Sequence, residues 1–248
     1  MGITRRSLVT SNWFKLVPRL CLGTDIQRLC LGKRLARWQN IIILSKILIS
    51  KAMIANKLPD YISPEDYLAG EELSQIKHEY IDGQVYAMAG ASDAHVTICL
   101  NLASALKNHL RGSGCRVYMA DMKAQIDTAN VFYYPDIIIT CDRRDKALQN
   151  HKKYPCLIIE VLSPSTEALD RGDKFADYQK LETLQEYVLI SQKRQRLECF
   201  RRNAEGFWVL QFYCPGSEIH LSSIDFRISM DALYEDVTFG DNQAENQS

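Results

Sequence analysis

Two acidic residues in the middle of the chain interrupt otherwise apolar segments. Asp136 is followed by three isoleucines, and Glu160 lies between the apolar segments 157–159 and 161–162. A lone acid in an apolar strand costs free energy unless it is paired with a cation or bound to a metal. Two such acids on neighbouring strands can bind one Mg²⁺ ion, which prefers oxygen ligands and keeps some of its waters. Asp136 and Glu160 are therefore the first candidates for a metal site.

Each of these acids also has a simpler interpretation, in which it faces solvent from the edge of a strand. For Asp136 this alternative is strong, because Pro-Asp is also a common turn pair. The pair taken together favours a site, since each acid is bounded by apolar residues. The segment 142–154 between them is polar and long enough to connect two strands.

Hydrophobic periodicity and turn signals predict the elements that position these acids. Ser63 and Pro64 mark the start of a helix, and Asp82-Gly83 marks a hairpin turn. Further helices are expected over residues 95–110, 170–181 and 230–236, and strands over 79–88 (a hairpin), 116–126, 131–141, 156–162, 186–191, 196–201 and 207–213. A sheet with helices before and after it indicates the α/β or α+β class.

The charge of the chain is unevenly distributed. Residues 1–52 hold ten Lys or Arg and one acid, whereas residues 53–248 hold twenty Lys or Arg and twenty-nine acids, so the net charge of the whole is zero. A net acidic body argues against a protein that binds duplex DNA stably, because such binding usually needs a basic patch. It argues less against a nuclease, whose bound metal supplies positive charge at the phosphate.

The first fifty residues read unlike the rest of the chain. Residues 1–52 are expected to be a basic extension that is disordered or not native protein, with translation starting at Met53; the alternative is a basic arm for nucleic acid or a membrane surface. The apolar run 41–49 is too short and too polar for a membrane helix. Residues 53–240 are expected to form the folded domain, and residues 241–248 a loose tail.

Eight cysteines are scattered through the chain without a CxxC pair, so the spacing typical of a zinc site is absent. Cys141 and Cys156 lie in apolar strand-like segments, where we expect them to be free and to pack as small hydrophobic side chains. No export signal is recognisable. Together these features indicate a reducing, cytoplasmic environment.

Three motifs resemble a known family. They are Tyr-Pro-Asp-Ile-Ile-Ile at 134–139, Leu-Ile-Ile-Glu-Val-Leu-Ser-Pro-Ser-Thr at 157–166 and Asp-Arg-Gly-Asp-Lys-Phe-x-x-Tyr at 170–178. They are similar to a large bacterial family of restriction endonucleases with the PD-(D/E)XK fold, and the resemblance covers roughly residues 58–237. It implies a restriction-endonuclease-like core with a central mixed sheet flanked by helices. It also implies an endodeoxyribonuclease that depends on Mg²⁺ or Mn²⁺.

One position departs from the general motif of that superfamily. The motif has a lysine two residues after the glutamate, where this chain has Leu162. The family pattern offers Lys174, on the following helix, as the substitute. Such a lysine would place its ammonium group beside the scissile phosphate. The alternative is an ordinary solvated helix lysine.

Four further residues are weaker candidates. Glu79 would be a third acid on the metal, or a surface acid at a strand start. His95 would contact metal or phosphate, or be a structural histidine. Asp121 would support the site from a neighbouring strand, or simply lie on a polar strand face. Arg171 would contact phosphate, or pair with Asp170 or Asp173 on the surface.

The leading hypothesis is hydrolysis of phosphodiester bonds in DNA, with Asp136, Glu160 and Lys174 as the catalytic residues. A homodimer is compatible with it, since a duplex offers two strands. The alternative is a non-catalytic module that keeps the fold and binds nucleic acid or protein, which the missing motif lysine and the acidic body favour. A hydrolase for another phosphorylated substrate is a third interpretation. The chain has neither a GxSxG nucleophile motif nor a GxxxxGK[ST] nucleotide loop.

Overall fold

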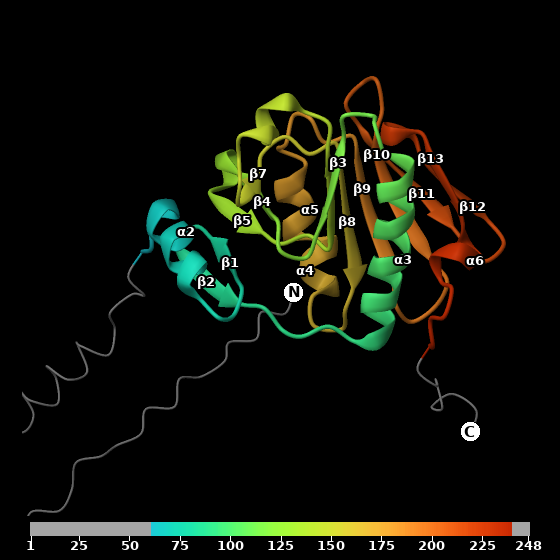
Figure 1. Ribbon diagram of the computed structural model, residues 1–248, viewed down its shortest axis with the longest axis horizontal. Helices are drawn as coiled ribbons and strands as arrows, with labels where there is room; N and C mark the ends of the chain where they lie inside the picture. The colour runs from blue at the N-terminus through green and yellow to red at the C-terminus, as the bar shows by residue number, and fades with distance from the viewer. Residues whose placement is uncertain (1–60, 240–248) are drawn as a thin grey trace, which may run out of the picture. The chain divides into compact units, whose positions relative to one another are not determined.

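A six-stranded sheet lies at the centre of the described part of the chain, residues 61–239 of this computed structural model (Figure 1). Its strand order is β11-β10-β9-β8-β6-β3. In chain order the strands are β3 (Arg116–Met119), β6 (Ile137–Thr140), β8 (Leu157–Leu162), β9 (Glu186–Ser191), β10 (Leu197–Arg202) and β11 (Trp208–Tyr213). β8 and β9 are parallel, whereas the other neighbouring strands are antiparallel. The expected central mixed sheet is therefore confirmed.

A second sheet has five short strands in the order β2-β1-β5-β4-β7. They are β1 (His78–Ile81), β2 (Gln84–Ala87), β4 (Lys123–Ile126), β5 (Val131–Tyr133) and β7 (His151–Lys152). Helix α2 (Pro64–Leu73) packs on this sheet through Tyr67, which stacks on Tyr80 and contacts Phe132. Ser63 caps α2 as expected, because its hydroxyl accepts a hydrogen bond from the Asp66 amide.

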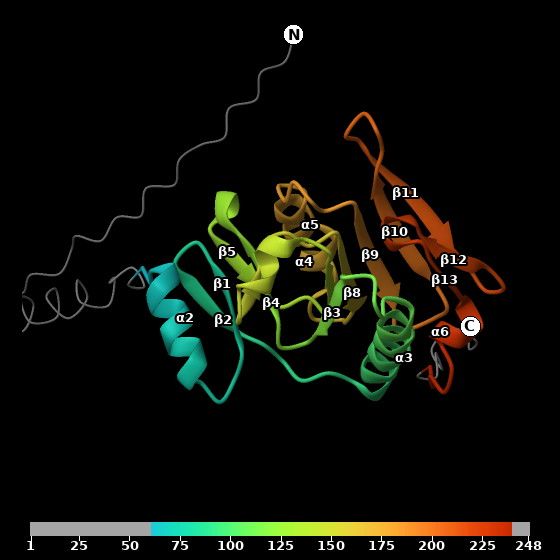
Figure 2. The same cartoon turned by 45° about the horizontal axis from the view of Figure 1, so that its top comes forward.

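Helices cover both faces of the central sheet (Figures 1 and 2). α3 (Asp93–His109) packs on one face, together with α6 (Met230–Leu233) and the hairpin of β12 (Glu218–Leu221) and β13 (Phe226–Ser229). α4 (Glu167–Arg171) and α5 (Asp173–Tyr178) lie over the other face. Ile137 and Ile139 point into the α3 core, whereas Ile138 points into the α5 core. Because both faces of the sheet are covered, β6 and β8 are apolar along their whole length except at Thr140 and Glu160.

Two of the expected strands are each divided between the two sheets. The segment 116–126 breaks into β3 and β4, and the segment 131–141 breaks into β5 and β6. Ala120, at the first break, has a left-handed backbone with φ of 52°, and its amide donates to the Asp136 carbonyl at 3.1 Å. Pro135-Asp136 forms the second break. The crossing between the sheets therefore fixes the backbone of Asp136.

The expected helix 170–181 is also divided. Gly172 ends α4 and precedes α5, with a non-helical ψ of −99°. The last helix, expected over 230–236, ends at Leu233. Strands β7, β12 and β13 were not predicted, and neither were three 3₁₀ turns, η1 (Asp127–Ala129), η2 (Arg143–Lys146) and η3 (Ser222–Ile224). All of these are short, so they carry little periodic signal.

The expectation that Cys141 is a free cysteine is wrong. It forms a disulfide with Cys115, the residue opposite it at the end of the β3–β6 ladder. Cys156 is free and buried, as predicted. The pairing was not legible because the two residues belong to strands whose register the sequence does not reveal.

Several predictions fall outside the described residues. The extension 1–52, the start at Met53 and the tail 241–248 all lie there. Within residues 61–239, every helix is too short or too polar to span a bilayer.

Candidate metal and catalytic site

Asp136 and Glu160 meet at one end of the antiparallel pair β6 and β8. Ile137 pairs with Ile159, so Asp136 lies opposite Glu160 at the next position of the ladder. The Asp136 amide donates to Glu160 Oε2 at 3.3 Å, and the Val161 amide donates to Asp136 Oδ2 at 2.7 Å. The structure thus brings together the two acids that the sequence singled out.

Lys174 lies at the centre of a group of carboxylates. Its Nζ is 2.9 Å from Glu79 Oε1, 3.3 Å from Asp170 Oδ1 and 3.5 Å from Glu160 Oε1. Only 5% of the Lys174 side chain is exposed, which excludes the alternative of a solvated helix lysine. The break at Gly172 separates Asp170 from Lys174, yet both side chains still reach the same point. We call Glu79, Asp136, Glu160, Asp170 and Lys174 the acid cluster.

The acid cluster carries more negative than positive charge. Burial raises the pKa of Glu160 well above its ordinary value; the Lys174 ammonium opposes this shift, whereas Asp170, Asp136 and Glu79 add to it. Burial likewise raises the pKa of Asp170. Burial would lower the pKa of Lys174, but the charges of Glu160, Glu79 and Asp170 raise it instead, so this lysine stays protonated. Glu79, Asp170 and Glu160 share one ammonium group, and Asp136 beside them has no ion pair with it, so the acids of the cluster outnumber its cations.

His95, at the start of α3, extends the acid cluster on its α3 side. Its Nε2 lies 2.9 Å from Asp136 Oδ1. Burial lowers the pKa of His95, but the hydrogen bond and charge of Asp136 outweigh this and raise it. The buried Nδ1 atom has no hydrogen-bond partner among the described residues.

Cys99, one helical turn after His95, was not a candidate from the sequence. Donor atoms of His95, Cys99 and Asp136 lie within 4.8 Å of one another, so these three side chains could hold a metal ion. The i, i+4 spacing of His95 and Cys99 on one helix was the available signal. It was overlooked because Cys99 reads equally well as a packed apolar residue.

Aromatic residues enclose the acid cluster. The Tyr178 hydroxyl donates to Glu160 Oε1 at 3.1 Å, and the Lys174 ammonium lies 5.4 Å from the centre of the Tyr133 ring. The Tyr134 amide donates to Glu79 Oε1 at 3.3 Å. Tyr178 and Asp170 belong to the motif 170–178, but neither was named as a site residue. Glu160, Asp170 and Lys174 are buried behind these contacts.

The remaining two candidates make other contacts. Asp121 is exposed and forms an ion pair with Lys77. Arg171 donates to both oxygens of Glu198, at 2.6 and 3.1 Å, and to Glu167 at 3.1 Å. Neither side chain has a hydrogen bond or ion pair to the acid cluster within residues 61–239. Arg171 does pair with acids, as in its alternative interpretation, but they are Glu198 and Glu167 rather than the expected Asp170 or Asp173.

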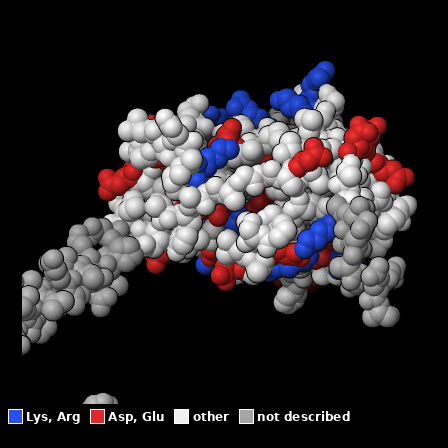
Figure 3. Space-filling view, turned by 90° about the horizontal axis from the view of Figure 1, so that it is seen from below, with Lys and Arg blue, Asp and Glu red and all other residues white. Residues whose placement is uncertain are grey.

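Figure 3 shows the face of the molecule at which α3 begins and β8 ends, the end that carries the acid cluster. Acidic and basic side chains are interspersed on it among uncharged residues, and no broad basic patch is visible there. A nucleic acid would therefore gain little attraction from this surface alone.

Comparison with known proteins finds a matching family model, two related sequences and a similar solved structure. A family model described as "Putative restriction endonuclease" matches residues 64–231. The uncharacterized Synechocystis protein slr1290 is 40% identical over 178 residues, which cover 72% of this chain and 94% of the relative. The uncharacterized protein sll1609 of the same organism is 31% identical over 155 residues, covering 60% and 85%. A solved structure from Anabaena variabilis, described as a putative nuclease belonging to DUF820, is similar with a TM-score of 0.54 and 16% identity, covering 65% of this chain and 91% of its own. At this identity the structural likeness supports the fold alone.

Proposed function

The chain belongs to the family described as "Putative restriction endonuclease", and on that premise we propose that it hydrolyses phosphodiester bonds in DNA with the help of a divalent cation. The observation that carries this proposal is the cation deficit of the acid cluster. Glu160, Glu79 and Asp170 are buried and converge on the Lys174 ammonium, and the partly exposed Asp136 lies beside Glu160 and pairs with His95. Buried carboxylates are stable when they are paired or bound to a metal. A bound divalent cation would supply the positive charge that the acid cluster lacks.

The donor set fits a divalent cation held by Asp136 and Glu160, with Glu79 as a third acid. Carboxylate oxygens are the ligands that Mg²⁺ and Mn²⁺ prefer. A cation bound there would polarise the phosphate and lower the pKa of a bound water. His95 and Cys99 add softer donors beside Asp136, which suit Zn²⁺ better than Mg²⁺. Metal selectivity is therefore one of the quantities to measure.

Lys174 supplies the positive charge that Leu162 cannot supply. Its ammonium is held between Glu79, Asp170 and Glu160, so its position is fixed before substrate binds. A fixed, buried cation stabilises negative charge that develops on a phosphate without the cost of reorganising solvent. Its raised pKa keeps it charged at neutral pH. This is the role of the lysine that the general motif places on the strand.

His95 and the Val161 amide orient Asp136. They hydrogen-bond to its two different oxygens, at 2.9 Å and 2.7 Å. A carboxylate held from both oxygens has one orientation, as a metal ligand requires. His95 is therefore a positioning residue in this proposal, and Tyr178 has the same role for Glu160.

DNA as the substrate has two corollaries. It implies that the protein works in the cytoplasm, where bacterial DNA is found. It also favours a homodimer, because two copies of the site can cut both strands of a duplex. Sedimentation of the full chain with and without duplex DNA measures the second corollary, and a monomer on DNA would contradict it.

The alternative function is a non-catalytic module that binds nucleic acid or protein. The excess of acids over residues 53–248 and the interspersed charges of Figure 3 favour it over a nuclease that binds DNA tightly. It makes a distinct prediction, namely a metal-free fold that binds a partner and cleaves nothing.

Cleavage of supercoiled plasmid by the full chain tests the proposal. We expect nicking with Mg²⁺ or Mn²⁺ and none in excess chelator. Glu160→Gln should lower the rate by about 10³-fold or more, because several kcal/mol of charge stabilisation are lost with the metal. Glu186→Gln is the matched control, since Glu186 is a buried glutamate on the neighbouring strand outside the acid cluster. A folded parent protein that cleaves with none of Mg²⁺, Mn²⁺ and Zn²⁺ would favour the non-catalytic module.

A further inference from the structure

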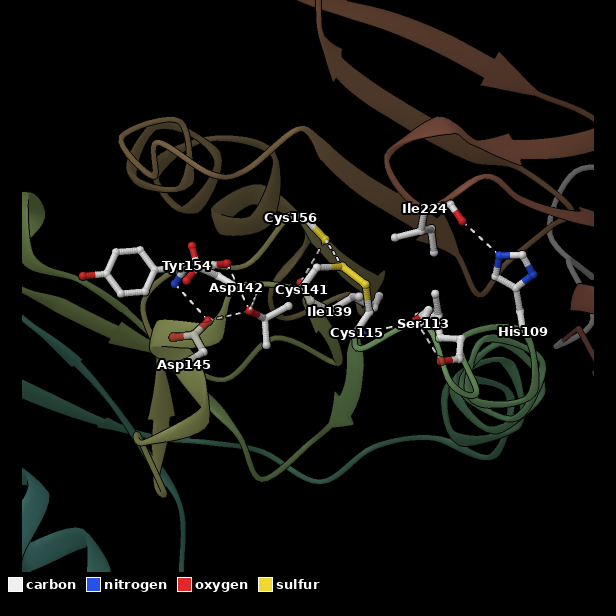
Figure 4. Close-up of a disulfide and its surroundings, with 12 residues drawn as sticks. His109, Ser113, Cys115, Ile139, Cys141, Asp142, Asp145, Tyr154, Cys156 and Ile224 are labelled. Atoms are coloured by element: carbon white, nitrogen blue, oxygen red, sulfur yellow. Dashed lines mark hydrogen bonds between the residues drawn. A yellow bond between two sulfur atoms is a disulfide. The ribbon is translucent and has the colours of Figure 1, made fainter.

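Three cysteines meet at the end of the central sheet that lies opposite the acid cluster. Cys115 precedes β3, Cys141 follows β6 and Cys156 precedes β8. Cys141 is bonded to Cys115, and its Sγ lies 3.7 Å from the Sγ of Cys156 (Figure 4). Cys141 is thus the sulfur that both other cysteines can reach. We call these residues the cysteine triad.

The cysteine triad is open to small molecules. Cys141 is exposed, whereas Cys156 is buried behind it. Both residues line an open cavity of about 480 Å³, within the size range of small-molecule sites. The other lining residues are largely polar: Asp142, Tyr154, Glu182, Thr183, Leu184, Gln185, Arg202 and Asn203. A short peptide-like thiol would find hydrogen-bond partners along this wall.

The disulfide adds little to the connectivity of the sheet. β3 and β6 are already paired from Arg116 with Thr140 to Met119 with Ile137, and the disulfide closes the end of that ladder. A bond with a purely structural role also needs no third thiol beside it. These features point to thiol–disulfide exchange rather than to a disulfide that only stabilises the fold.

We propose that the cysteine triad is a thiol–disulfide exchange site, at which a low-molecular-weight thiol or disulfide enters through the cavity and reacts at Cys141. Cys115 and Cys156 are the two alternative partners that resolve the mixed disulfide. The site is independent of the acid cluster, and the proposal does not rest on nuclease activity.

The exchange balances in two steps. In the reduced protein, the Cys141 thiolate attacks one sulfur of a small disulfide, forms a mixed disulfide and releases one small thiolate. The thiolate of Cys115 or Cys156 then attacks Cys141 Sγ, forms the protein disulfide and releases the second small thiolate. The protein loses two electrons and two protons, and the small disulfide is reduced to two thiols. Reduction by excess thiol runs the same steps backwards.

The surroundings of each sulfur fix the order of events. Burial raises the pKa of the Cys156 thiol to about 11, so little of it is thiolate at neutral pH. It is a slow first nucleophile, and it donates to the Ile139 carbonyl at 3.5 Å instead. The exposed Cys141 therefore reacts first. Cys156 then attacks the mixed disulfide at Cys141. Its sulfur lies only 3.7 Å from Cys141 Sγ, and this proximity offsets the small fraction of Cys156 that is thiolate.

Peptide mass spectrometry tests the proposal directly. The three cysteines fall in different tryptic peptides, residues 112–116, 124–143 and 154–171, so each pairing has its own cross-linked product. The full chain is reduced, freed of reductant, treated with glutathione disulfide, alkylated and digested. Exposed Cys214 serves as an internal control for a stable glutathione adduct, and buried Cys99 as a control for protection.

The proposal predicts different products for each variant. Wild-type protein should form the 115–141 cross-link, and Cys115→Ser should form the 141–156 cross-link instead. The double variant Cys115→Ser, Cys156→Ser should keep a glutathione adduct on Cys141, because no partner resolves it. Three results would overturn the proposal: a wild-type protein in which Cys141 stays free while Cys214 reacts, a Cys115→Ser adduct at Cys141 that Cys156 never resolves, or a double variant without the adduct. The near-ultraviolet circular dichroism of each variant confirms its fold.

Discussion

Two buried glutamates on adjacent parallel strands have opposite environments. Glu160 on β8 and Glu186 on β9 are 3% and 0% exposed. Glu186 receives hydrogen bonds from Arg201 at 2.7 Å, from the Ser222 amide at 3.1 Å and from the Ser223 amide at 2.8 Å. Burial would raise its pKa, but Ser223 and Arg201 lower it below the ordinary value. Glu160 instead shares one ammonium with other acids, and its pKa is raised.

The difference separates a structural acid from a functional one. Glu186 has the Arg201 guanidinium as an ion-pair partner besides its two backbone amides, so its charge is balanced within the fold. Glu160 has no ion-pair partner of its own, so the metal-free fold carries a cost that either protonation of Glu160 or a bound cation removes. Natural proteins keep such a cost where function requires it. Burial alone would have assigned both glutamates the same role.

The largest effect on stability is expected at Lys174. Lys174→Ala should lower the rate of DNA cleavage by about 10²–10³-fold, the usual loss on removing one preorganised electrostatic group. It should also lower the free energy of unfolding by about 3–5 kcal/mol in metal-free protein, because its carboxylate partners stay buried without it. Lys174→Arg should rescue poorly, since a planar guanidinium does not fit the place of a compact ammonium. Cleavage rates and denaturant unfolding measure both effects; full activity in Lys174→Ala would reduce this lysine to a structural role.

Smaller changes in the free energy of unfolding are expected at the two glutamates, and they differ between Glu186 and Glu160. Glu186→Gln should lower the free energy of unfolding by about 1–3 kcal/mol, because it weakens charge-assisted hydrogen bonds and leaves Arg201 without its partner. Glu160→Gln should leave metal-free stability unchanged or raise it, because it removes a buried charge without enough counter-charge. Urea unfolding of both variants in chelator gives the comparison. Equal losses in the two variants would mean that the two environments do not differ as described.

The smallest effect is the pH dependence of these differences. Glu186 has a lowered pKa in the folded state, so its stabilisation is present above the ordinary carboxyl pKa and is lost as the pH falls through the lowered value. Glu160 has a raised pKa in the folded state, so the folded protein is destabilised progressively as the pH rises from the ordinary carboxyl pKa through the raised value. Melting temperatures of wild type and both glutamine variants, measured from about pH 2 to pH 8, should therefore show the Glu186 effect below the ordinary carboxyl pKa of about 4.3 and the Glu160 effect above it. If the melting temperatures of wild type and both variants changed with pH in the same way, the opposite pKa shifts of Glu186 and Glu160 would be contradicted.

The sequence was sufficient for the class of fold and for four of the five residues that the structure brings together in the acid cluster. Lone acids in apolar strands pointed to Asp136 and Glu160, and motif similarity pointed to Glu79 and Lys174. The partition of strands between two sheets was not predicted, because the partial alternation along 116–126 gives no signal at Ala120, and 131–141 reads as one strand although Pro135-Asp136 is a common turn pair. Asp170 was hidden by its position at a helix start, where acids are common for other reasons. The contact of Cys141 with Cys115 and Cys156 depends on register, which composition and spacing do not encode.

Calorimetric titration with Mn²⁺ tests the central claim most directly, because it asks whether the acid cluster holds a cation without relying on a choice of DNA. The account predicts that wild type and Glu186→Gln bind Mn²⁺ with similar affinity, whereas Asp136→Asn and Glu160→Gln lose that binding although Glu160→Gln remains at least as stable as wild type. Binding of Mn²⁺ to Glu160→Gln with the affinity of wild type, or no binding to folded wild type, would contradict it.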